Sequence, residues 1–295
     1  MASAVDMRNA EAVIGLFERA AEAVRRCRWR VGSVVKLPAS GRIVISGDLH
    51  DQPEHLRKIA EAGGLRAGSE RHVVLQEVIH GERLMNGMDF SHRTLAKVAE
   101  LVEGFPDQVH VVLANHELAQ LTGRGVSKGA GNTVEQFSGA LEYVFGDEYV
   151  SVEEAMKRFF RALPIAVRTE SGILCSHSLP APHEMAKFDF GLLERDLIDA
   201  DYQPPSGAAH VMVWGRRHTA EQIETLSNQW GVKLFCVGHE HAEMGIEMRG
   251  PKHVVLNSDH SRGIVVEFDL AEEPTAEKAV ERARPLVLLG GGGYE

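Results

Sequence analysis

The sequence has 295 residues, and its hydrophobic (44%) and charged (25%) fractions are those of an ordinary folded globular protein. The net charge of -10 argues against a protein that binds nucleic-acid phosphate backbones. Three widely spaced cysteines indicate no disulfide framework, and no apolar run is long enough to span a membrane. We therefore expect a cytoplasmic protein without a membrane partner.

The first half of the chain alternates between helical and strand-like segments. Residues 8–28 carry apolar side chains at helical spacing and predict an amphipathic helix. Three short apolar runs follow, with two further helical segments between them. Such alternation predicts a parallel sheet covered by helices. The predicted strands are 43–45, 72–75 and 110–114, and the helices between them are 53–62 and 94–103.

The second half of the chain contains more strands and fewer helices. Residues 122–132 are rich in glycine and predict a loop or lid, and residues 133–163 predict helix. Strands then follow closely, which favours a mixed or antiparallel sheet packed against the first. A helix near 219–230 begins with a capping box formed by Thr219 and Gln222. The predicted strands are 164–169, 172–176, 211–214, 233–237, 253–257 and 263–269, and a last helix is predicted at 271–284.

Side chains that bind metal ions follow four of the strand-like runs. Asp48 and His50 follow the first run, and residues two apart on an extended chain point to the same side. Open α/β sheets hold their ligands at the carboxyl ends of strands. Carboxylate and imidazole groups together suit a metal ion, so the sequence predicts a metal site at this edge. The other runs precede Asn115-His116-Glu117, His177 and His239-Glu240-His241.

These motifs, in this order, resemble those of the calcineurin-like metallophosphoesterases, and within them the serine/threonine protein phosphatase branch. Gly47-Asp48-Leu49-His50 is similar to the family's Gly-Asp-x-His, and Ala114-Asn115-His116-Glu117 to its Gly-Asn-His-Glu. Ile173-Leu174-Cys175-Ser176-His177 and Val237-Gly238-His239 resemble the segments that carry its last two histidines. The match implies an α/β fold, a four-layer αββα sandwich of two mixed β-sheets flanked by helices. It divides the chain into an N-terminal helical extension (1–37), a metallophosphoesterase domain (38–270) and a C-terminal helix and flexible tail (271–295).

The resemblance implies a role for each matched residue. His116 would be the general acid that protonates the leaving alcohol. The arginine that the family carries in its second motif, a phosphate binder, is His80 here, and Arg216 and Arg217 are the candidates to replace it, with Arg216 the first choice. The implied ligands are Asp48, His50 and His241 for a first metal ion and Asn115, His177 and His239 for a second, with Gln76 between the two.

The second motif departs from the family pattern Gly-Asp-x-Val-Asp-Arg-Gly. The aligned residues 75–81 place Gln76 where an aspartate would bridge two metal ions. A glutamine offers one neutral carbonyl oxygen and neutralises no charge. Three outcomes are open: Gln76 ligates weakly, Glu77 supplies the bridge, or one metal site is lost. Strand alternation points Glu77 the opposite way and disfavours the second outcome.

A metal-dependent phosphoesterase is therefore the function that we expect, with one or two divalent ions such as Mn, Fe or Zn. It would hydrolyse phosphomonoesters, in a phosphoprotein or a small phosphoester, by attack of an activated water. Ile79 replaces the aspartate that would orient His116, so Glu77 or Asp259 would have to orient it. Two alternatives stay open. One is a binding or regulatory module weakened by Gln76, and the other is a nucleotide phosphohydrolase or phosphodiesterase.

Overall fold

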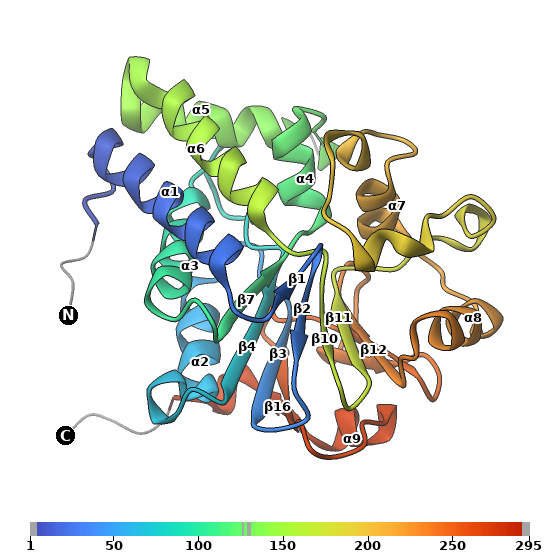
Figure 1. Cartoon of the computed structure of the whole chain (residues 1–295). Helices are drawn as coiled ribbons and strands as arrows, with labels where there is room; N and C mark the ends of the chain where they lie inside the picture. The colour runs from blue at the N-terminus through green and yellow to red at the C-terminus, as the bar shows by residue number, and fades with distance from the viewer. Residues whose placement is uncertain (1–4, 126, 129–130, 291–295) are drawn as a thin grey trace.

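The computed structural model describes residues 5–125, 127–128 and 131–290, and two β-sheets lie at its centre (Figure 1). One sheet has five strands in the order β16-β15-β3-β4-β7, and β3, β4 and β7 run parallel. Helices α2 (Pro53–Gly63) and α3 (His92–Gly104) connect them, as the sequence predicts. The strands are β3 (Arg42–Asp48), β4 (Arg71–Gln76), β7 (Val109–Val112), β15 (Ile264–Asp269) and β16 (Ala283–Pro285).

The other sheet has seven strands in the order β1-β2-β10-β11-β12-β14-β13. It is mixed: β11, β12 and β14 are parallel neighbours, whereas β10 is antiparallel to β11. This arrangement confirms the mixed sheet predicted for the second half of the chain. Its strands are β1 (Arg30–Val31), β2 (Val34–Leu37), β10 (Ala166–Thr169), β11 (Ile173–Ser176), β12 (Leu234–Val237), β13 (Ile246–Met248) and β14 (His253–Leu256).

The two sheets pack face to face through an apolar layer. Side chains alternate along β3, so that Ile43 and Ile45 enter this layer while Val44 joins the core beneath the helices. Short helix α9 (Ala276–Glu281) closes one end of the layer with Ala276 and Ala279. The result is the four-layer αββα arrangement that the family resemblance implies.

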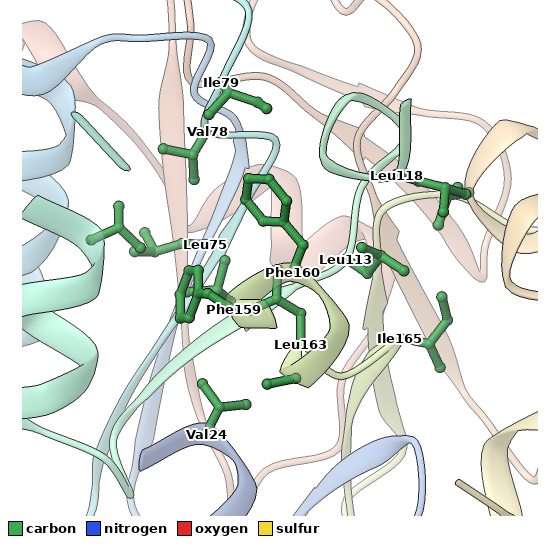
Figure 2. Close-up of a cluster of buried hydrophobic side chains, with 14 of the residues drawn as sticks. Val24, Leu75, Val78, Ile79, Leu113, Leu118, Phe159, Phe160, Leu163 and Ile165 are labelled. Atoms are coloured by element: carbon green, nitrogen blue, oxygen red, sulfur yellow. The ribbon is translucent and has the colours of Figure 1, made fainter. Parts of the chain in front are cut away.

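Helices cover the outer faces of both sheets (Figure 1). Helices α1, α2, α3, α5 and α6 lie on the side of the five-stranded sheet, and α7 and α8 lie beside the seven-stranded sheet. Figure 2 shows Phe159 and Phe160 of α6 in the core, with the Phe160 ring directed toward Val78 and Ile79. The remaining bounds are α1 (Ala10–Arg26), α4 (Asn115–Thr122), α5 (Thr133–Phe145), α6 (Tyr149–Ala162), α7 (Ala208–Trp214) and α8 (Ala220–Trp230). Among the described helices, none has both the length and the apolar character needed to cross a membrane.

One predicted element is wrong, and another has different bounds. The predicted strand at 211–214 is the end of α7, because a four-residue apolar run carries no periodicity that separates strand from helix. The predicted helix at 271–284 is shorter and gives way to β16. The capping box at the start of α8 is confirmed, since the Thr219 side chain accepts a hydrogen bond from the backbone of Gln222.

The structure describes part of the predicted glycine-rich loop and leaves the domain boundaries untested. The glycine-rich segment follows α4 and contains β8 (Ser127–Lys128) and β9 (Gly131–Asn132). Its residues 126 and 129–130 lie outside the described residues, as does the predicted tail from 291 onward. The domain division stays a prediction, although β2 pairs with β10 inside the seven-stranded sheet and α1 packs against α6.

Candidate metal centre

The carboxyl ends of strands from both sheets meet at one place. The five-stranded sheet supplies Asp48 at the end of β3, Glu77 just after β4 and Asn115 at the start of α4. The seven-stranded sheet supplies His177 after β11 and His239 after β12. These side chains are far apart in sequence, and each of them is at least nine-tenths buried. The convergence predicted from the strand ends is therefore present.

Two glycines allow the sheets to approach this closely. A Cβ on Gly47 would lie 2.1 Å from the carbonyl oxygen of Leu256 in the other sheet. A Cβ on Gly238 would lie 2.0 Å from Asp48 Oδ1 and 2.7 Å from Gln76 Oε1. Real Cβ atoms do not approach other atoms this closely, so only glycine fits at either position. The glycines of the Gly-Asp and Gly-His motifs thus have a steric cause.

Glu77 places its carboxylate at the centre of the cluster. Its Oε2 lies 3.3 Å from His50 Nε2, and its Oε1 lies 3.6 Å from His116 Nε2 and 3.7 Å from His177 Nε2. The backbone at Glu77 has a φ of 45°, which ends the extended conformation of β4. Strand alternation therefore no longer applies, and the expectation that Glu77 points away from the site is wrong.

Hydrogen bonds hold the Glu77 turn in place. The Glu77 carbonyl accepts hydrogen bonds from the backbone N–H groups of Leu49 (3.0 Å) and His50 (2.9 Å). The buried carboxylate of Glu117 accepts from the N–H groups of Val78 (2.8 Å) and Ile79 (3.2 Å). Positive φ values also occur at His50 and His239, and such backbone conformations concentrate at functional sites. The third residue of the Asn-His-Glu motif thus positions the turn that carries Glu77.

The ligand atoms form two groups that share Glu77. One group contains His50, Glu77 and His116, and the other contains Glu77, His177 and His239. Within each group the potential ligand atoms lie within 4.8 Å of one another. Asn115 Oδ1 adjoins the second group, 2.6 Å from His177 Nε2 and 3.1 Å from His239 Nδ1. A carboxylate that adjoins both groups can offer an oxygen to an ion in either of them.

Gln76 faces the cluster but is engaged in hydrogen bonds. Its Nε2 donates to the Ser46 carbonyl at 2.9 Å, which leaves Oε1 as an acceptor 3.1 Å from His177 Nδ1. A proton on His177 Nδ1 would donate to Gln76, and the lone pair of Nε2 would then serve a cation that Asn115 Oδ1, 2.6 Å away, also ligates. A hydrogen bond of this kind fixes the tautomer and the ring orientation of a metal-binding histidine. The ligand role predicted for Gln76 itself stays a prediction.

Burial sets the protonation of the cluster. Burial, and then the neighbouring Glu77 carboxylate, raise the pKa of Asp48 well above its ordinary value. Burial also lowers the pKa of His177 well below its ordinary value and that of His239 to about 3, with Arg216 contributing to both. Neutral imidazoles are the form that binds metal ions. Two buried carboxylates side by side are destabilised unless a cation lies between them, so these residues fit a divalent ion of the Mn, Fe or Zn type.

The other predicted residues lie around this centre. His116 is buried, and its ring centroid is 5.0 Å from that of His50. Arg216 is exposed, and its guanidinium lies 3.5 Å from His239 Nδ1 at the edge of the site. His241 is also exposed and belongs to neither ligand group within the described residues; its ring lies 5.6 Å from His260. The chemical roles of these residues stay predictions.

The chain was compared with known protein families, sequences and structures. The sequence profile of the calcineurin-like phosphoesterases matches residues 41–243, which is more than half of the chain. No curated protein sequence matches it. A serine/threonine phosphatase from Saccharomyces cerevisiae with similarity to human phosphatase PP5 has a similar structure, with a TM-score of 0.62 at 14% identity over 88% of this chain and 82% of that one. A cold-active protein-tyrosine phosphatase from a psychrophilic Shewanella species gives 0.55 at 13% identity over 80% and 77%. At these identities the structural likeness concerns the fold.

Proposed function

This chain belongs to the calcineurin-like phosphoesterase family, and we propose that the cluster around Glu77 hydrolyses phosphomonoesters with the aid of two divalent ions. The observation that carries the proposal is the Glu77 carboxylate, which adjoins both groups of histidines: Oε2 lies 3.3 Å from His50 Nε2 and Oε1 lies 3.7 Å from His177 Nε2. Glu77 thereby supplies the negative charge that Gln76 cannot supply. This is the second of the three outcomes that the sequence leaves open.

The proposed ligands come from the two groups, with Asp48 in the place of His116 in the first and Asn115 added to the second. Asp48, His50 and Glu77 would hold a first ion, and Glu77, Asn115, His177 and His239 would hold a second. Ions held there supply positive charge for the phosphate oxygens and Lewis acidity for the attacking water. Gln76 would contribute by orienting His177 through the hydrogen bond to Nδ1.

His116 and Arg216 would act on the substrate. Histidine exchanges protons near neutral pH, and His116 lies at the side of the cluster next to His50, where it would protonate the leaving alcohol. Arg216 adjoins His239 and carries a planar guanidinium that can donate two hydrogen bonds to phosphate oxygens. Such contacts orient the ester and balance its charge in the transition state.

The substrate class that we propose is a phosphomonoester on an exposed side chain or a small molecule. The two similar structures are phosphatases described for serine/threonine and for tyrosine, which makes phosphorylated side chains the first compounds to test. Nucleotides and phosphodiesters form the second set in the same panel. Their preferential hydrolysis would favour the nucleotide phosphohydrolase or phosphodiesterase alternative.

The experiment compares the wild type with variants of the proposed machinery. Protein purified without chelator and supplied with Mn²⁺ should hydrolyse p-nitrophenyl phosphate and β-glycerol phosphate. Asp48→Asn should lose about 10²-fold or more in kcat on both substrates, and His116→Ala should lose as much on β-glycerol phosphate, whose leaving oxygen needs a proton. His183→Ala changes an exposed histidine that pairs with Glu184, and it should retain the wild-type rate. An inert wild type that binds metal and phosphate would instead support the binding-module alternative.

A further inference from the structure

A buried polar network formed by His80, Gln120 and Glu153 adjoins His116. The ring centroid of His80 is 5.1 Å from that of His116, and His80 Nε2 lies 3.1 Å from Gln120 Oε1. Gln120 in turn donates from Nε2 to Glu153 Oε1 at 2.8 Å. The three residues come from the turn after β4, from α4 and from α6, and all are at least about nine-tenths buried. The network therefore connects the proposed general acid with a carboxylate on another helix.

The hydrogen bonds fix which atoms donate. Glu153 can only accept when ionised, and Gln120 Nε2 also lies 3.2 Å from Ser138 Oγ. Both amide hydrogens of Gln120 thus have acceptors, so its Oε1 faces His80. That oxygen can only accept, so His80 must carry a proton on Nε2. In the neutral ring this leaves Nδ1 as the nitrogen with a lone pair.

The position of the His80 ring is held from several sides. Its backbone N–H donates to Ser91 Oγ at 3.1 Å. Phe137 packs edge-on against the ring, with 5.7 Å between centroids. A ring held by packing and by a hydrogen bond at Nε2 presents one face and one tautomer to its neighbour. That neighbour is His116.

We propose that Glu153 is a positioning residue for His116, acting through Gln120 and His80. Glu153 orients the Gln120 amide, the amide selects the Nε2–H tautomer of His80, and the His80 ring holds the His116 ring in its reactive orientation. The catalytic part of this proposal rests on the proposed function, whereas the part that concerns the His80 tautomer does not. To Glu77, a partner considered from the sequence whose Oε1 lies 3.6 Å from His116 Nε2, it adds a network that ends on α6.

The chain offers a matched control beside Glu153. Lys157 lies 3.3 Å from Glu153 and 3.0 Å from Glu154, so both carboxylates pair with the same ammonium group. Of these two glutamates, Glu153 contacts Gln120, whereas the side chain of Glu154 is more than half exposed. Glu154→Leu therefore removes a similar charge from α6 without touching the network. Glu153→Gln keeps a carbonyl oxygen that can accept from Gln120, and it serves as the conservative variant.

The first test observes the tautomer in metal-free protein. Long-range ¹H–¹⁵N correlation spectra of histidine-labelled protein separate Nε2–H from Nδ1–H rings, and a His80→Asn sample assigns the His80 signals. We expect the Nε2–H form in the wild type, in Glu154→Leu and in Glu153→Gln. In Glu153→Leu we expect a mixture of tautomers. An unchanged His80 tautomer in folded Glu153→Leu would overturn the proposal.

The second test uses the leaving group. Alkyl phosphates need a proton on the leaving oxygen, whereas p-nitrophenolate leaves easily without one. Glu153→Leu should lower kcat for β-glycerol phosphate about tenfold with KM within about twofold, and should lower kcat for p-nitrophenyl phosphate much less. Glu153→Gln should restore most of the loss. Equal losses on both substrates, or the same loss in Glu154→Leu, would show a merely structural role and overturn the proposal.

Failure of the proposed function gives a different pattern. A wild type that hydrolyses neither substrate removes the phosphoesterase proposal, and the tautomer measurement still decides whether Glu153 controls His80. A mixed tautomer in Glu153→Leu would then support the Glu153–Gln120–His80 connection by itself. An unchanged tautomer would overturn it.

Discussion

Histidines lie at both ends of β4 and β7, in two different electrostatic settings. At the starts of these strands, the rings of His72 and His110 stack with centroids 5.4 Å apart, and their nitrogens are 3.1 Å apart. Beyond the carboxyl ends of the same strands, His116 lies beside the carboxylate of Glu77. Both sets are buried, so burial alone does not make a metal site.

The pKa values show what separates the two ends. At the strand starts, burial lowers the pKa of His72 to about 4 and that of His110 to about 3, which leaves a neutral pair joined by one hydrogen bond. At the carboxyl ends, buried carboxylates add negative charge that neutral imidazoles cannot balance. The comparison teaches that the carboxylates Asp48 and Glu77 turn a group of buried histidines into a candidate cation site.

The largest expected effect comes from comparing matched histidine substitutions at the carboxyl ends and at the starts of the strands. His177→Asn removes a fully buried imidazole of the second ligand group and should lower kcat about 10³-fold together with the bound metal. His110→Leu changes an equally buried histidine at the other end and should leave kcat per folded molecule within about twofold. Rates and metal content are measured on fractions whose fold is verified by circular dichroism. Similar losses in both variants would refute the distinction.

A second prediction concerns the pH dependence of stability at the strand starts. Because the folded pKa values of His72 and His110 lie below 6.5, the unfolded chain takes up protons first as the pH falls. The stability that they contribute is fully present above about pH 6.5 and is lost as the pH falls toward 4. A His72→Leu/His110→Leu variant should therefore match the wild type within about 1 kcal/mol at pH 8 and exceed it by about 2 kcal/mol or more at pH 5.

The measurement for this pair is urea unfolding of metal-free protein at both pH values. Equal differences between variant and wild type at pH 8 and pH 5 would mean that the two rings titrate normally in the folded protein. The claim that His72 and His110 form a neutral, buried pair would then be wrong.

A third prediction concerns Arg216, which is exposed at the edge of the candidate metal centre. Arg216→Ala removes the guanidinium beside His239 and should lower kcat/KM for phosphomonoesters about tenfold, mainly through KM. Arg217 lies next in sequence, and its backbone N–H donates to Glu240 Oε2 at 3.4 Å. Arg217→Ala is therefore the control and should change kcat/KM by no more than about twofold. A larger effect at Arg217 would assign the phosphate contact to that residue.

The smallest effect is expected at His92, another buried histidine. His92 is fully buried among Phe90, Phe137 and Phe145, and its ring nitrogens have no hydrogen-bond partner within the described part of the chain. His92→Phe should raise the free energy of unfolding by about 1 kcal/mol at pH 7, because it replaces an unsatisfied polar ring by an apolar one of similar shape. Thermal or urea unfolding measures this, and a destabilised variant would contradict it.

Much of the fold could be predicted from the sequence, because its signals are local. The alternation of strands and helices up to β7 gives the parallel half of the five-stranded sheet, and the Thr219 capping box gives the start of α8. The region of α7 could not be predicted in the same way. Its apolar run at 211–214 is too short to show a period, and the helix begins before it, at Ala208.

The candidate site was predictable up to the point where the backbone leaves the strands. The strand ends predicted that Asp48, Asn115, His177 and His239 converge, and the structure brings these side chains together, while their role as ligands stays a prediction. The direction of Glu77 was not predictable, because a left-handed residue reverses the alternation on which the expectation was based. An acidic residue directly after a strand, beside a glutamine that stands in for an acid, is the one signal that could have identified it.

The hydrogen-bond networks could not be predicted from the sequence. Gln120 and Glu153 are 33 positions apart, and His80 and Gln120 are 40 apart. They meet because α4 and α6 pack against the turn after β4, as the position of Phe160 near Val78 and Ile79 also shows (Figure 2). No local pattern indicates such pairings.

The most direct test of the central claim is a Mn²⁺ titration of wild type and Glu77→Gln, monitored by electron paramagnetic resonance. If the Glu77 carboxylate joins two ions, the wild type should bind two per chain and show a spin-coupled spectrum, while Glu77→Gln should lose the coupled signal and bind at most one ion tightly. Gln76→Glu serves as the control and should retain both ions. Two coupled ions in Glu77→Gln, or no tight binding to the wild type, would contradict the account.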